Sequence, residues 1–391
     1  MHKTPQRLRW MKNLNVIYVA NFILSFHLFL VIYANSSFLT QFVEERFVGT
    51  LFIIGSVLTV ASFLIISGAL RKIGNFALML IFSTLQFFFF LIFAFSDNAQ
   101  IILPTFIAYI VTYPLILYSI DIFIESYTKE EGSTGVIRGT LLTTANVALI
   151  LAPLVAGFVL NQSSFGTLYL LSALFIIPFV LLMLRFRHFK DPVYKKLEIK
   201  NTFLCIKGDQ DLFGIFMSQF LMRFFFSWMV IYMPIYLTQH LGFSWAEFGI
   251  MTFIFLLPFA LLEYPVGKIA DTWLGEKEFL ISGFLITSMF ILFIPLVNTT
   301  SFAFWASLLF FVRVGASLIE ITTESYFFKH VDGSDSGTIS FFRMTRPVAY
   351  ILGPLVGTIT LYFLDFQYIW FVLGIIFLSG IWFASKIRDT L

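Results

Sequence analysis

The chain has 391 residues, of which 59% are hydrophobic and 12% charged, and its formal net charge is +3. Soluble globular domains carry about 25% charged residues, so this composition excludes a soluble protein and predicts an integral membrane protein. The single cysteine, Cys205, excludes a disulfide framework and a thiolate metal site. Residues 1–12 are basic and precede an apolar run of full spanning length, which we interpret as a first transmembrane helix and not as a signal peptide.

Twelve apolar runs follow one another along the chain, each long enough to cross a hydrocarbon core about 30 Å thick. The runs are continuous, whereas the strands of a membrane barrel would be about ten residues of alternating character, so they predict helices. Their expected bounds are residues 14–36, 48–70, 75–96, 100–126, 136–160, 165–186, 212–238, 245–266, 278–297, 300–326, 338–362 and 366–386.

Positive charge alternates between the connections and predicts the orientation. Lys and Arg gather at both termini and in every second connection, while the opposite connections hold one base, Arg46. By the positive-inside rule, both termini and the long connection 187–211 are expected on the cytoplasmic side of the cell membrane. The lysines of that connection favour either a solvated linker or a contact with anionic headgroups.

The second half of the sequence repeats the first. The triplet Glu-Ser-Tyr at residues 125–127 returns at 324–326, and Pro-Leu-Val at 153–155 returns at 354–356, about 200 residues later in each case. Solenoid units repeat after about 20–50 residues, so the spacing indicates two similar halves instead. We predict six-helix bundles at 1–186 and 212–391, joined by the linker 187–211. Parallel repeats of this kind are typical of secondary transporters.

Two motifs resemble signatures of the major facilitator superfamily. Gly267-Lys268-Ile269-Ala270-Asp271, followed by Gly275-Glu276-Lys277, is similar to the family's loop between helices 8 and 9. In the first half the same motif has Gly68 and Gly74, but Lys72 stands at the acidic position. The runs around Pro153 and Pro354 resemble the family's helix 5 motif, with alanines where the antiporters prefer glycine.

The resemblance covers essentially the whole chain and carries expectations about fold and partners. It implies an all-α integral membrane protein with twelve transmembrane helices in two pseudo-symmetric bundles, and a cavity lined by helices 1, 4, 7 and 10. We expect a small-molecule substrate, contact with the lipid bilayer, protons as a coupling ion, and a monomer. We expect no cofactor, no bound metal and no nucleic acid.

Charged residues inside membrane helices are costly and mark functional sites. Arg223 and Arg313 fall near the predicted midplane. An arginine keeps its charge, so each needs water, an acid or an anion, which favours a substrate with a carboxylate or phosphate group. The alternative is that the two arginines reach Asp121 or Glu320 and tie the halves together. Polar neighbours on predicted helices 1, 7 and 10 complete the expected substrate site, namely Gln219, Ser317, Asn21 and His27.

His27 has a second interpretation, because a single histidine between apolar residues is more often a structural hydrogen-bonding group. The acids have two expected roles. Asp121 and Glu320 are the deeper pair and are predicted to bind and release protons. Glu125 and Glu324 lie nearer the cytoplasmic end, where we expect gate salt bridges to bases such as Arg343 and Arg346.

The loop between predicted helices 8 and 9 has an expected role of its own. An acid just beyond a helix end can cap a neighbouring helix or pair with a base. Gly267 and Asp271 therefore predict a cytoplasmic latch that holds one conformation shut.

Three functions fit these features. The first is a secondary transporter that moves a small anionic or zwitterionic organic solute by alternating access, with proton coupling. The second is an exporter of amphipathic, drug-like or lipid-like molecules, which the aromatic composition also suits. The third is a membrane sensor or scaffold with a transporter fold. No nucleophile and base pair or metal-ligand cluster stands out, so we do not expect an enzyme, and the basic patches are too small for nucleic acid.

Overall fold

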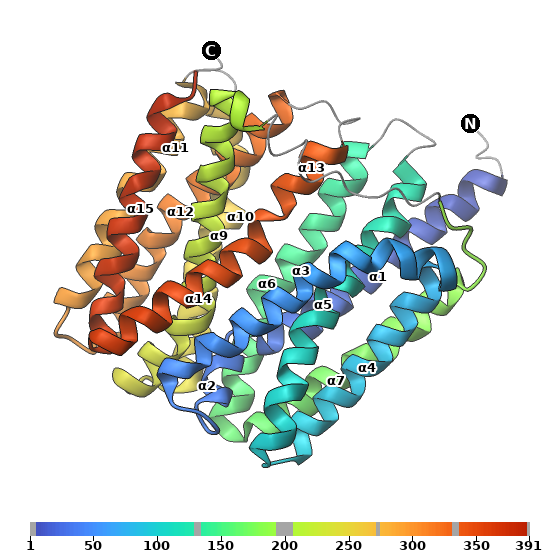
Figure 1. Cartoon of the computed structure of the whole chain (residues 1–391), viewed down its shortest axis with the longest axis horizontal. Helices are drawn as coiled ribbons and strands as arrows, with labels where there is room; N and C mark the ends of the chain where they lie inside the picture. Colours follow the sequence, from blue (N-terminus) through green and yellow to red (C-terminus); the bar gives the residue numbers. More distant parts are fainter. Residues whose placement is uncertain (1–4, 129–133, 193–205, 271–273, 331–335, 389–391) are drawn as a thin grey trace. The chain divides into compact units, whose positions relative to one another are not determined.

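The computed structural model describes residues 5–128, 134–192, 206–270, 274–330 and 336–388 (Figure 1). These residues form helices and no strands. Eleven of the helices are long and apolar enough to cross a membrane. The prediction of an all-α, multi-pass membrane protein is therefore confirmed.

The helix bounds follow the predicted spans closely. The helices are α1 (Pro5–Ile32), α2 (Asn35–Leu39), α3 (Glu45–Ile73), α4 (Asn75–Phe95), α5 (Ala99–Thr128), α6 (Thr134–Gln162), α7 (Phe165–Met183), α9 (Gln210–Ile235), α10 (Trp245–Ile269), α11 (Gly275–Phe293), α12 (Phe302–His330), α13 (Ser336–Arg343), α14 (Thr345–Phe363) and α15 (Ile369–Lys386).

The span predicted at 338–362 differs from the others because it is divided between α13 and α14. The helix breaks at Met344. Pro347 has no N–H with which to bond the carbonyl of Arg343, so one bond of the helical ladder is missing at this point. The Thr345 hydroxyl instead donates to the Phe342 carbonyl, at 2.7 Å. The broken segment is not among the eleven helices above.

The chain divides into two compact units. The first holds Met1–Phe42 and Ile54–Lys196, and the second holds Val43–Ile53 and Leu197–Leu391. The first unit thus extends into the predicted linker, and the first turns of α3 belong to the second unit.

Each unit has the same packing scheme. In the first unit α1 packs on α6, and α4 packs on α5 and α7. In the second unit α9 packs on α14, and α11 packs on α12 and α15 (Figure 1). The repeat in the sequence is therefore also a repeat in packing.

Polar side chains in the connections cap the first turns of α9 and α10. Asp209 caps α9, because its carboxylate accepts from the backbone N–H of Asp211 at 2.9 Å and of Leu212 at 3.1 Å. Ser244 and Glu247 form a reciprocal capping box at the start of α10. These bonds satisfy N–H groups that have no partner within the helix.

Glycines allow a close helix crossing in the second unit. Gly283 on α11 faces Gly315 on α12, and a Cβ atom at Gly283 would lie 2.8 Å from the Gly315 carbonyl oxygen. A Cβ at Gly315 would lie 2.7 Å from the Gly283 carbonyl oxygen. Because both obstacles are backbone atoms, a side chain there would force the helices apart. Small residues at such crossings allow membrane helices to approach closely.

Gly283→Ala is expected to lower the free energy of unfolding by about 1–3 kcal/mol, because the added methyl group overpacks the crossing. Unfolding of the purified protein in detergent, followed by tryptophan fluorescence, measures the change. Gly68→Ala is the matched control, since a Cβ at Gly68 would meet no atom within 4 Å. Equal stability of the two variants would contradict the close crossing.

Candidate functional site

A charged network joins α9 and α12 inside the second unit. Arg223 donates from Nη1 to Oε1 of Glu320 at 3.0 Å, and its Nη2 lies 3.6 Å from Oε1 of Glu324. The side chain of Arg223 is 18% exposed and those of the two glutamates are 27% exposed. Partial burial strengthens these ion pairs relative to surface pairs, because the effective dielectric constant is lower there. Arg223 therefore has an acid in reach, and both partners lie in the same unit.

Gln219 lies one turn before Arg223 on the same face of α9. With its amide oriented to suit its neighbours, the carbonyl oxygen accepts from Nη2 of Arg223 at 2.9 Å and from Nε at 3.2 Å. The amide nitrogen donates to the Thr323 hydroxyl at 3.1 Å. Gln219 thus binds the guanidinium of Arg223 through a neutral carbonyl group, and its own side chain is almost fully buried.

The network continues to α13. Arg343, the last residue of α13, donates to Oε1 of Glu324 at 2.7 Å. Glu324 and Arg343 thus form an ion pair, and their role as a gate stays a prediction. Two ring contacts fasten α13 further, since Phe342 stacks on Phe327 with centroids 3.9 Å apart and Phe341 stacks on Phe216 at 5.0 Å.

Arg313 lies in a different environment, fully buried among aromatic rings. Its guanidinium carbon is 5.2 Å and 5.1 Å from the ring centroids of Phe225 and Phe226 on α9. The rings of Phe255 and Phe259 on α10 lie 4.9 Å and 5.7 Å away. Aromatic faces attract a guanidinium within about 6 Å, so the four rings stabilise the buried charge.

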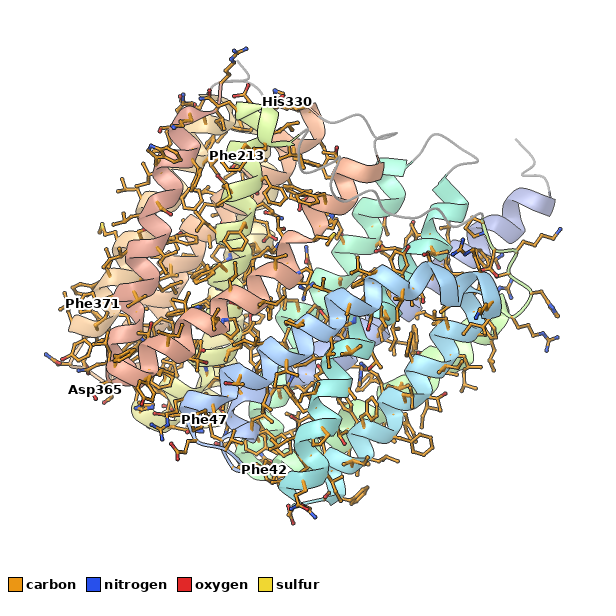
Figure 2. The ribbon with its side chains drawn as sticks, in the orientation of Figure 1. Phe42, Phe47, Phe213, His330, Asp365 and Phe371 are labelled. Atoms are coloured by element: carbon orange, nitrogen blue, oxygen red, sulfur yellow. The ribbon has the colours of Figure 1, made fainter. Side chains whose placement is uncertain are left out.

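Phe226 connects the two arginines. The guanidinium carbon of Arg223 lies 5.6 Å from the centroid of this ring, and that of Arg313 lies 5.1 Å from it. The two arginines that the sequence placed near the midplane are thus gathered in one cluster of α9, α10 and α12. Figure 2 labels Phe213 in the first turn of α9 and His330 at the end of α12, which mark one end of this cluster's helices.

The other residues predicted for the substrate site make bonds within their own bundles. Ser317 is buried and donates to the Val314 carbonyl of its own helix. In the first unit Asn21 donates to the Leu141 carbonyl at 3.0 Å and to the Thr144 hydroxyl at 2.9 Å, which ties α1 to α6.

His27 is fully buried between α1, α4 and α7. Its Nδ1 lies 2.8 Å from the Ser172 carbonyl oxygen, and its Nε2 lies 3.1 Å from the Gln86 side-chain oxygen. Its ring also packs on Phe90, with centroids 4.4 Å apart. This is the structural role that the sequence left open, so we leave His27 out of the proposed site.

The remaining acids and gate residues are placed as follows. Asp121 has an exposed side chain on α5. Arg346 is exposed in the first turn of α14, and a Cβ at Gly267 would meet no atom within 4 Å. Asp271 and the side chain of Glu125 lie outside the described residues, so their predicted roles stay predictions. Among the described residues, no three His, Cys, Asp or Glu side chains gather as metal ligands.

Two features of the cluster were not predicted from the sequence. Thr323 was overlooked, although it directly precedes Glu324 and bonds Gln219. The rings around Arg313 were assigned no function, because lipid-facing and core phenylalanines look alike in a sequence with 53 of them. A triple of phenylalanines at residues 224–226, directly after Arg223, was the available signal.

The repeated packing and the apolar helices describe a multi-pass membrane protein with a charged cluster in its second unit. Residues 215–390 match the family model of the Major Facilitator Superfamily. The crystal structure of the nucleoside transporter NupG is similar in fold, with a TM-score of 0.75 and 12% sequence identity, over 96% of this chain and 100% of that chain. A search of curated proteins gave no match. The second half of the chain thus matches the superfamily's model, and the whole chain has a fold similar to that of NupG.

The pairing of Arg223 with Glu320 is expected to contribute about 1–3 kcal/mol of coupling energy, because both groups are largely removed from water. A double-mutant cycle with Arg223→Met and Glu320→Gln, read from unfolding in detergent, measures this term. The pair of Arg388, which is 90% exposed, and Asp211 is the control, and at 3.9 Å it should couple by less than about 1 kcal/mol. A coupling for Arg223 and Glu320 no larger than the control would show that the pair is solvated.

Proposed function

We propose that the protein is a secondary active transporter of a small anionic or zwitterionic organic solute, working by alternating access between the two units. The observation that carries the proposal is the network of Arg223, Glu320, Glu324 and Arg343. Charges at this depth are costly, and in membrane proteins they mark substrate and ion pathways. Arg223 offers a planar fork of N–H donors, which suits a carboxylate or phosphate group.

Charge balance gives the network its proposed chemistry. Two arginines and two glutamates leave it neutral, and Glu320 occupies the donors that an anionic substrate would need. An anion that displaced Glu320 from Arg223 would add one negative charge to a partly buried site. Protonation of Glu320 would remove one negative charge and release Nη1 of Arg223 at the same time. The proposed coupling therefore loads one proton together with one anionic group.

Glu320 is the proposed proton carrier because its protonation would free Nη1 of Arg223, and charged groups lie around it on several helices. Arg223 faces it from α9, and Glu324 follows one turn later on α12 and is held by Arg343 of α13. On α11, Glu276 is bonded to Ser325 and Lys329. Two further charged residues, Lys268 and Glu263, belong to the C-terminal part of α10. The side chain of Glu263 lies outside the described residues. In the first unit, Asp121 is proposed as a second proton carrier.

A second candidate function is export of amphipathic, drug-like molecules. The four phenylalanine rings around Arg313 support it, because rings beside a cation suit a ligand with an aromatic body and an acidic group. The nucleoside named for NupG defines a third substrate class to be tested. The remaining alternative was a membrane sensor or scaffold. No observation in the described part of the second unit supports it.

The proposed setting follows from the distribution of Lys and Arg. We place the protein as a monomer in the cell membrane, with both termini in the cytoplasm. The end of the second unit that carries Arg343 and Lys329 is then the cytoplasmic end, and the pair of Glu324 and Arg343 is the proposed cytoplasmic gate contact.

Arg223→Gln is expected to lower uptake of the transported anion at least tenfold, because the bidentate donor is lost. Uptake into proteoliposomes measures this with benzoate, succinate, inorganic phosphate, glutamate and uridine, each with and without an inside-alkaline pH gradient. The double variant Arg223→Gln, Glu320→Gln keeps the site neutral, so its failure to transport could not be ascribed to an unpaired carboxylate. Arg388→Gln, at an exposed pair outside the network, should retain native uptake.

Glu320→Gln is expected to abolish stimulation by the pH gradient while exchange of labelled for unlabelled solute continues. Native uptake that ignores the gradient would remove proton coupling. Uptake of uridine alone, unchanged in Arg223→Gln, would remove the anion site. Transport of none of the five solutes would count against this substrate class and favour the amphipathic exporter, which efflux of a lipophilic dye tests.

A further inference from the structure

The turn between α3 and α4 consists of one residue, Gly74. Its φ of +79° lies in the left-handed region that favours glycine. The turn itself supplies no side chain that caps α4. The second unit has the equivalent glycine at Gly275, with φ of +70°, as the first residue of α11.

The two units supply the carboxylate of this turn in different ways. In the second unit Glu276, the residue after the glycine, is fully buried and accepts from the Ser325 hydroxyl on α12 at 2.9 Å. In the first unit the corresponding residue is Asn75, whose amide donates to the Ser119 carbonyl on α5 at 3.0 Å. An amide makes the bond to the neighbouring helix, but it brings no negative charge to the start of α4.

Asp191 brings that charge from beyond α7. Its Oδ1 accepts from the backbone N–H of Asn75 at 2.7 Å, over a sequence separation of 116 residues. A carboxylate at a helix N-terminus satisfies a free N–H and interacts favourably with the helix dipole. Gly74 leaves room for it, since a Cβ at this position would lie 2.7 Å from Oδ2 of Asp191.

A second contact holds the same segment. Phe189 packs at the edge of the cluster formed by Ile66, Leu70, Leu78, Leu115 and Ile122. Its ring meets that of Phe123 on α5 nearly at right angles, with centroids 4.7 Å apart. We call residues 187–192 the strap. The strap is thus fastened by an apolar contact on α5 and by a carboxylate on α4.

Two of these contacts involve residues of α5 that lie on either side of Asp121 in the sequence. Ser119, bonded by Asn75, comes two residues before Asp121, and Phe123, covered by Phe189, comes two residues after it. Asp191 acts on both, because it holds the backbone of Asn75 and lies two residues beyond Phe189 in the strap. We propose that Asp191 is a positioning residue for transport, fastening the strap to the α3–α4 turn and thereby fixing the stretch of α5 that carries Asp121.

The fastening of the strap is tested without any substrate. Trypsin cleavage after Arg187, which is exposed and whose scissile bond does not involve residue 191, should be about fivefold faster in Asp191→Ala than in the native protein, as expected for loss of a helix cap. Asp209→Ala removes a comparable cap from α9 and should leave this rate unchanged. Asp191→Glu should restore native cleavage. An unchanged rate in Asp191→Ala would overturn the fastening.

Glycine variants provide a second measurement if Asp191→Ala does not fold. Gly74→Ala strains the backbone and crowds Asp191, so it should speed cleavage of the strap. Gly68→Ala adds the same methyl group six residues earlier, where it meets no atom within 4 Å, and should not. Equal cleavage in both glycine variants would contradict the contact between Asp191 and the turn.

The positioning role rests on the proposed transport function and is tested by uptake of the best-transported solute among the five above. Asp191→Ala should lower the maximal rate about fivefold with the KM unchanged. In an Asp121→Asn background the same change should have no further effect, because coupled residues are not additive. Additive losses would mean that Asp191 only stabilises the fold, which overturns the positioning role. Faster cleavage with no measurable uptake in the native protein would sink the transport function and leave the strap intact.

Discussion

An arginine that enters a membrane helix must bring its charge partners with it, and the second unit is built around this requirement. Arg223 cannot lose its proton, so Glu320, Glu324 and the carbonyl group of Gln219 are arranged around its guanidinium. Each partner needs its own support: Thr323 orients Gln219, and Arg343 balances Glu324. The charged side chains that join α9, α12 and α13 sum to zero net charge in a partly buried site. Any change at one member must be answered by a proton, an ion or a rearrangement at another.

Arg313 solves the same problem with different chemistry. Four phenylalanine rings present their negative faces to a charge that is wholly removed from water. The two arginines share the ring of Phe226, so a movement of either guanidinium alters the surroundings of the other. The phenylalanine rings of the cluster therefore contact both charges as well as filling space. The cluster gives the second unit a polar compartment and an aromatic compartment side by side on α9 and α12.

Much of this could be predicted from the sequence, because bilayer thickness and backbone hydrogen bonding leave few choices. Continuous apolar runs predicted most helices to within a few residues, although α1 begins nine residues before its predicted start. Spacing placed Gln219 and Arg223 on one face of one helix, and Glu320 and Glu324 on one face of another. The pairing of Arg223 with Glu320 was one of two alternatives, since spacing along a helix does not tell which side chains reach each other. The break at Met344 was missed, although Pro347 encodes it, because the apolar pattern continues across it. The contact of Asp191 with Asn75 could not be predicted, since nothing in the pattern relates residues that far apart.

The break between α13 and α14 also makes the two repeats unequal. In the first unit the corresponding helix, α6, runs without interruption from Thr134 to Gln162. In the second unit the same stretch is divided at Met344, and the shorter piece ends in the arginine that pairs with Glu324. The duplicated fold therefore differs between its halves at the residue next to an ion pair of the charged network, so the two halves are not interchangeable copies.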